Sequence, residues 1–293
     1  MNGTPGSVLP PVAPRRRRTD RIMRLVLGSA TVLAIVPLVL VIFYLLQKGL
    51  GSWSINFFTT DPSGKFFGDP GGVKSAILGT IEMVALATLI AVPIGIGVAI
   101  YLVEYGKRGR FAQVVRYFVD VMTGVPSIVF GLFIYITLVL AGTGGTAFAG
   151  WKGSAALALL MLPIVTRAGE VVLSLVPDSL REAALALGAP RWRVVFRIVL
   201  PTALPGLITG MLLAVARAAG ETAPLIFTAT IVKGTSLDLN GPMNSLPAQI
   251  FSDVGQAQDR LVARAWGAAL TLVLMILMLT TLARVVSRRS RLI

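Results

Sequence analysis

The sequence predicts an all-α membrane protein that crosses the bilayer several times. Of its 293 residues, 55% are hydrophobic and only 14% are charged, which is too apolar for a soluble domain of this length. Apolar stretches long enough to span a bilayer core of about 30 Å recur along the chain. Cysteine and histidine are both absent, which excludes disulfides, thiolate chemistry and imidazole metal ligands.

Six apolar stretches define the predicted membrane spans. Five of them carry no charge, and one is interrupted only by Arg167 and Glu170. In chain order the stretches are 25–46, 83–103, 121–151, 153–176, 198–216 and 265–283. We expect the second span to begin near Lys74, and the third to contain one span followed by a glycine-rich exit.

The first of these stretches has a second interpretation as a cleaved secretory signal, because it follows the basic segment RRRRTDRIMR. A signal has an apolar core of roughly 7 to 15 residues, and the stretch at 25–46 is longer. We therefore expect a retained span. The predicted organisation is a disordered basic tail at 1–24, a transmembrane domain at 25–285 and a short basic tail at 286–293.

Basic residues set the predicted orientation. Most of the 27 lysines and arginines fall in four segments on one side of the predicted membrane, at 15–24, 107–116, 181–197 and 284–291. The positive-inside rule then places both termini in the cytoplasm. A net charge of +14 would suggest nucleic-acid binding in a soluble protein, but topology and anionic lipid explain it here. We expect membrane lipid and no nucleic acid as a partner.

The polar segment SLREAALALGAP, at 179–190, separates two late spans. Ser179 and Glu182 have the spacing of a capping box at the start of a helix. Gly188 suits the left-handed position that ends a helix, and Pro190 suits the first turn of another. The segment therefore predicts a short helix, a sharp turn and a second helix.

This short helix carries a narrow apolar stripe of Leu180, Ala183, Ala184 and Leu187, at i, i+3, i+4 and i+7. An amphipathic helix lying on the membrane surface is one interpretation. A helix seated in a groove of another protein is the other, and the small alanines favour it because they permit close approach but anchor weakly in lipid.

The same residues resemble the EAA motif of ATP-binding-cassette importer permeases, with Glu182-Ala183-Ala184, Gly188 and then Ile198-Val199-Leu200-Pro201 at the family's spacing. The resemblance implies the transmembrane domain of a type I (MetI-like) importer permease. It also implies that the loop at about 177–197 forms a coupling helix that docks on the ATPase subunit. Glu182, Ala183, Ala184 and Gly188 would then transmit nucleotide-driven motion, although Glu182 could equally act as a helix cap.

Two arginines, Arg167 and Arg217, are the only basic residues inside the predicted spans, and an acid accompanies each. Glu170 follows Arg167 at i+3, and Glu221 follows Arg217 at i+4 on one face of the helix predicted from RAAGETAPLIFTA. Each charge near the bilayer centre costs about 2.5 to 3.5 kcal/mol, so these residues are candidates for a substrate path. Guanidinium recognises oxyanions in a bidentate manner. Mutual neutralisation of buried charges is the other interpretation.

RAAGETAPLIFTA, at 217–229, and PMNSLPAQIF, at 242–251, are similar to the A-type permease subunit of phosphate-specific importers. The resemblance implies a plasma-membrane heterodimer with a C-type permease, two copies of a cytoplasmic ABC ATPase and an extracytoplasmic phosphate-binding protein. Two alternatives stay open. One is an importer of the same architecture for another oxyanion or small solute, such as molybdate or sulfate, and the other is a stand-alone secondary transporter.

The chain contains no G-x-x-x-x-G-K-[ST] motif, so it has no P-loop for ATP. We expect a permease and not an enzyme, with no catalytic residue, cofactor or metal of its own, and with ATP and Mg²⁺ used by the partner ATPase. Glu82 and Asp120 lie near span ends, where we expect structural roles. The outer loop at about 231–260 is long enough to predict a function, either as a cap on the entrance or as a receptor for the binding protein.

Overall fold

The computed structural model describes residues 14–63, 68–106, 109–142 and 146–289, and divides the chain into two units, 1–47 and 48–293. In the first unit it describes helix α1, which extends from Pro14 to Gly49. The described part of the predicted disordered tail, residues 14–24, is thus helical. Proline suits a first helical turn and arginine is a good helix former. Residues 1–13 of that tail lie outside the described residues.

The second unit is built on four long helices, α3 (Lys74–Ile100), α6 (Gly150–Ser174), α9 (Leu200–Ala219) and α12 (Asp259–Arg289). Shorter helices connect them: η1 (Leu50–Ser52), α2 (Ile55–Thr59), α4 (Arg110–Gly124), α5 (Ser127–Ile134), α7 (Asp178–Ala186), α8 (Arg191–Val194), α10 (Ala223–Thr228) and α11 (Leu246–Val254). Three π-helical segments continue or precede helices: η2 (Tyr101–Gly106), η3 (Tyr135–Val139) and η4 (Val195–Val199).

The predicted third span, 121–151, is not one straight helix. Helix α4 ends at Gly124, and α5 with η3 continues after a bend of 103°. Pro126 explains the break, because it lacks a backbone N–H and holds the preceding Val125 in an extended conformation. Among the described residues, five helices are long and apolar enough to cross a membrane, or six if the bent pair is one span. Residues 143–145 of the glycine-rich exit lie outside the described residues.

The core of the second unit lies where α3, α6 and α9 pack together. Small residues permit close approach of the backbones, as is usual between membrane helices. A Cβ at Gly169 of α6 would lie 2.8 Å from the Cβ of Ala99 on α3, and one at Gly210 of α9 would lie 2.5 Å from that of Ala168. These contacts fix α6 between its two neighbours.

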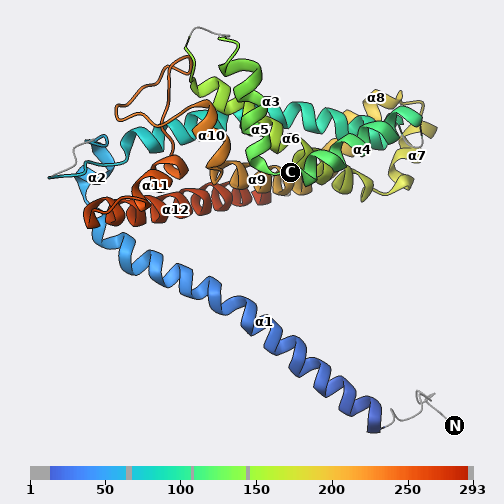
Figure 1. The fold of residues 1–293 in the computed structure, drawn as a ribbon. Coiled ribbons are helices and arrows are strands. Elements are labelled where there is room, and N and C mark those ends of the chain that lie inside the picture. Colours follow the sequence, from blue (N-terminus) through green and yellow to red (C-terminus); the bar gives the residue numbers. More distant parts are fainter. Residues whose placement is uncertain (1–13, 64–67, 107–108, 143–145, 290–293) are drawn as a thin grey trace. The chain divides into compact units, whose positions relative to one another are not determined.

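Some of the short helices lie toward the two ends of this bundle (Figure 1). Helices α7 and α8 lie at one end, and α2 and α11 lie at the other. Helix α11 falls inside the segment 231–260, so this predicted loop contains a helix as well as irregular chain. The Ser245 side chain accepts a hydrogen bond from the Ala248 N–H and caps α11, and a proline follows in its first turn.

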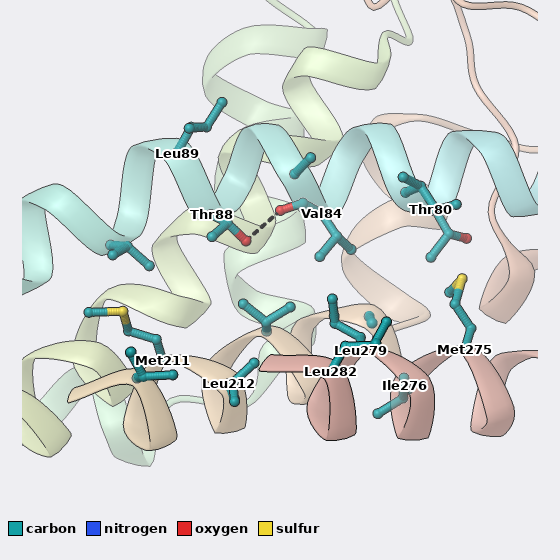
Figure 2. Close-up of a pocket in the computed structure, with 16 residues that line it drawn as sticks. Thr80, Val84, Thr88, Leu89, Met211, Leu212, Met275, Ile276, Leu279 and Leu282 are labelled. Carbon is teal, nitrogen blue, oxygen red and sulfur yellow. Dashed lines mark hydrogen bonds between the residues drawn. The ribbon is translucent and has the colours of Figure 1, made fainter. Parts of the chain in front are cut away.

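A groove of about 740 Å³ runs between α3, α9 and α12 (Figure 2). Its lining is hydrocarbon and thioether except for Thr80 and Thr88, whose hydroxyls donate to the carbonyls of Ala76 and Val84 at 2.7 Å. An anion in this groove would lose its hydration without gaining a charged partner. The site of charged chemistry must therefore lie elsewhere.

Candidate functional site

The predicted short helix and turn after α6 are present as α7, Gly188 and α8. Gly188 has φ +78°, the left-handed conformation expected of it, and Pro190 immediately precedes α8. The predicted capping box is wrong. Helix α7 begins at Asp178 after Pro177, with no side-chain cap, so Ser179 lies inside the helix. An acidic residue in the first turn favours this start through the helix dipole.

Helix α7 divides the predicted coupling residues between two faces. Ala184 is buried among Leu173, Val176 and Val199, in a cluster that also takes in the ends of α3 and α9. Glu182, Ala183, Gly188 and the stripe leucines Leu180 and Leu187 are exposed, Leu187 by 89%. Ala184 therefore packs α7 against the bundle, and the helix presents Glu182 and Ala183 outward. Since the helix begins at Asp178, Glu182 does not cap it.

A partly buried arginine that the sequence gave no reason to single out, Arg181, also holds α7. The Arg181 guanidinium donates from Nε and Nη2 to Glu104 Oε1 of η2, at 3.0 and 2.9 Å. It also donates to the carbonyls of Leu173 and Val176, at 2.9 and 2.5 Å. Glu104 is 77 residues away in the chain, so no local spacing could have identified it.

Arg167 and Glu170 belong to a four-residue charge cluster. Arg167 Nη1 donates to Glu170 Oε2 at 2.6 Å, as the i,i+3 spacing predicts, and Arg167 Nη2 pairs with Asp120 of α4. Arg116, also of α4, donates to Glu170 Oε1 at 2.6 Å and to the Leu102 carbonyl at 3.0 Å. Two carboxylates thus neutralise Arg167, and the cluster ties α4 to α6.

Arg217 and Glu221 do not lie on one continuous helix, so that prediction is wrong. Helix α9 ends at Ala219, and α10 begins at Ala223 with Pro224 in its first turn, because a proline there could not donate to the preceding turn. The two side chains still approach each other, with Arg217 Nε 3.7 Å from Glu221 Oε1. This separation is longer than a hydrogen bond, and the Arg217 side chain is 60% exposed. Arg217 is thus the less neutralised of the two candidate arginines.

The two arginines lie at different levels of the bundle. Arg167 is seven residues before the end of α6, or about 10 Å at 1.5 Å per residue, from the end that carries α7. Arg217 is 17 residues into α9, which begins at that same end, or about 25 Å away from it. The structure therefore places two separate charged sites along the bundle, one at Arg167 and one at Arg217.

Two further basic residues lie in long helices, because α6 and α12 begin before the uncharged stretches that predicted them. Lys152, near the start of α6, is fully buried and donates to the carbonyls of Thr146 and Ala147 at 2.8 and 3.1 Å. Arg264, near the start of α12, is buried with Asp253 of α11, and their side chains form two bonds of 2.7 Å.

The segment 242–251 contributes a buried polar chain next to that ion pair. Asn244 donates to Gln249 at 2.8 Å, and Gln249 donates to Asp253 at 2.8 Å. Of the two carboxylates expected to be structural, Asp120 pairs with a cation as described above. One oxygen of Glu82 is buried without a hydrogen-bond partner among the residues that the structure describes.

Residues 91–292 match the family of binding-protein-dependent transport system inner membrane components. The chain is 43% identical to the phosphate transport system permease protein PstA of Yersinia pestis, covering 94% of this chain and 92% of that protein. It is 39% identical to PstA 1 of Mycobacterium tuberculosis strain H37Rv, covering 97% and 94%.

Solved structures share the fold at lower identity. A chain of a bacterial alginate ABC transporter is 16% identical, with a TM-score of 0.67 over 94% of this chain and 96% of that one. A chain of the MetNI methionine ABC transporter is 20% identical, with a TM-score of 0.56 over 73% and 93%. The chain therefore belongs to the binding-protein-dependent inner-membrane transport components, and within them to the PstA permease family.

Proposed function

We propose that this chain is a permease subunit of an ATP-driven importer and that it carries inorganic phosphate across the inner membrane. The observation that supports an anionic substrate is Arg217, which lies at a helix break and is incompletely neutralised by Glu221. The relatives of this chain are named phosphate permeases. Other oxyanions, such as sulfate and molybdate, share the chemistry that a guanidinium recognises. They are therefore competitors in the test.

The proposed assembly is a heterodimer with a C-type permease, two copies of a cytoplasmic ABC ATPase and an extracytoplasmic phosphate-binding protein. Both termini and α7 would face the cytoplasm, which follows from the basic segments. The exposed face of α7, with Glu182 and Ala183 and with Leu187 directly after the helix, is suited to a groove on the ATPase. Ala184 and Gly188 would hold that face at its angle, because one is packed on the bundle and the other forms the turn.

In the proposed substrate path, the anion meets the charged site at Arg217 first and the one at Arg167 second. Arg217 receives the anion near the outer end, and Glu221 beside it keeps the site from holding the anion too tightly, since conduction requires release as well as entry. Arg167 lies deeper and is paired with Glu170 and Asp120. An anion can approach it when Asp120, whose side chain is 61% exposed, moves aside.

Alternating access links these parts. ATP would close the two ATPase subunits and draw the coupling helices together, and the spans would turn the cavity toward the binding protein. Hydrolysis of ATP, with Mg²⁺ in the partner's site, would reset the cavity toward the cytoplasm. This chain supplies the path and the docking helix, and the partner supplies the energy.

The experiment is phosphate uptake into proteoliposomes that contain this chain with its proposed partners. Arg217→Ala should abolish uptake while the complex still assembles. Arg217→Lys should retain only part of the activity, because an ammonium keeps the charge but lacks the planar bidentate donor. Undiminished uptake by an assembled Arg217→Ala complex would refute the assigned role of Arg217.

A further inference from the structure

Helix α7 is too short to be stable by itself. It has nine residues, and isolated helices below about 12–15 residues are marginal in water. Its position must therefore come from contacts with the bundle. Ala184 supplies an apolar contact, but a methyl group packed in a cluster does not fix a direction. The directional contact is the Arg181 side chain, which is only 14% exposed.

The Arg181 guanidinium joins three elements. Glu104, 11% exposed, comes from η2, the continuation of α3. The carbonyls of Leu173 and Val176 belong to the last turn of α6 and the residues just after it. Asp178, at 3.1 Å, belongs to α7 itself. Carbonyls at a helix end lack intrahelical donors and attract a cation. Arg181 therefore supplies hydrogen-bond donors to the carbonyls at the end of α6 while it pairs with Glu104 in the continuation of α3.

The Arg181 side chain connects α7 to both α6 and the π-helical continuation of α3. Helices α3 and α6 pack against each other, and their middle parts form the core of the bundle. On α7, Arg181 faces inward and its neighbour Glu182 faces outward. One guanidinium therefore links α7 to the ends of two spans.

We propose that Arg181 and Glu104 are positioning residues that transmit the motion of α7 to α3 and α6. This inference rests on the proposed function, because α7 is taken to dock on an ATPase. Loss of the pair uncouples ATP hydrolysis from uptake and leaves the ATPase bound, since the docking face of α7 is unchanged.

The central test is the double substitution Arg181→Met with Glu104→Leu, in the complete importer in proteoliposomes. Replacing a buried ion pair by apolar side chains of similar volume is often tolerated by the fold, whereas breaking it leaves a buried charge. The ATPase should co-purify and hydrolyse ATP as before. The ratio of phosphate imported to ATP hydrolysed should fall by about tenfold, within the range of coupling carried by packed networks.

Two further variants keep the test decisive. Glu104→Gln keeps the shape of the acceptor and removes its charge, so it should lower the same ratio by a smaller factor. Asp178→Asn is the matched control, since it removes the other carboxylate of the same arginine. That carboxylate is 83% exposed, and exposed pairs contribute little, so the ratio should be unchanged.

The outcomes separate the inference from the proposed function. An unchanged ratio in the double variant, or in Glu104→Gln if the double variant does not assemble, overturns the role of the pair. Loss of the ATPase from both variants also overturns it, because the pair would then shape the docking face. Failure of the unsubstituted chain to recruit an ATPase refutes the proposed function before any variant is compared. Import of a different solute refutes only the assignment of phosphate as the substrate. The ratio of that solute imported to ATP hydrolysed still tests the role of Arg181 and Glu104.

Discussion

The turn at Gly188 allows a substitution whose whole effect is conformational. Gly188 has φ +78°, and a Cβ built on it meets no atom within 4 Å. A Cβ at this position therefore creates no clash, and its cost comes from the left-handed backbone. That cost is about 1–2 kcal/mol for an L-residue, and β-branched residues are least suited to this region.

Gly188→Val should therefore lower the equilibrium constant for the native turn by about 5- to 30-fold, since 1.4 kcal/mol corresponds to tenfold. Because the turn sets the angle between α7 and α8, binding of the ATPase should weaken measurably, by up to that factor. Titration of purified ATPase onto the permease pair in detergent or nanodiscs measures this affinity directly.

Gly188→Asn is the matched control, because asparagine visits the left-handed region at low cost. It should bind the ATPase nearly as well as the unsubstituted chain. Two results would contradict this expected difference between valine and asparagine. Equal losses for valine and asparagine would mean that a partner contacts the glycine itself, and wild-type affinity for valine would mean that the turn does not position α7.

Four other substitutions test the packing and the charge cluster. Asp253→Asn should destabilise the chain by about 3–5 kcal/mol, because it leaves Arg264 buried without its counterion, and a large fall in the thermal midpoint of the purified complex would be the sign. Gly169→Leu should prevent the close contact of α3 and α6, so the protein should be lost from the membrane fraction. Glu170→Gln should reduce assembly more than Asp120→Asn, because Glu170 is 15% exposed and holds two arginines, whereas Asp120 is 61% exposed. Equal membrane levels for these last two variants would contradict that ranking.

The features that could be predicted from the sequence are local ones. Gly188 adopts its left-handed turn because only nearby residues decide it, and Arg167 meets Glu170 because i+3 spacing places them together on a helix. The six apolar stretches were recognisable because bilayer thickness sets their length. The bend in the third stretch could not be predicted, because a proline such as Pro126 can either be tolerated within a span or break it.

The features that were missed depend on tertiary packing. Glu104 pairs with Arg181 across 77 residues, and Arg116 pairs with Glu170 across 54. No spacing in one sequence indicates such partners. The capping box failed for a different reason: Ser179 and Glu182 have the right spacing, but a helix that starts at Asp178 places the serine inside. Short motifs predict that a helix exists more reliably than they predict its first residue.

The most direct test of the central claim is uptake of labelled phosphate by proteoliposomes that contain this chain, its partner permease, the ATPase and the binding protein. We expect uptake that requires both ATP and the binding protein and that excess sulfate or molybdate barely reduces. Uptake without an ATPase, or an assembly that hydrolyses ATP while moving sulfate or molybdate in place of phosphate, would contradict the central claim.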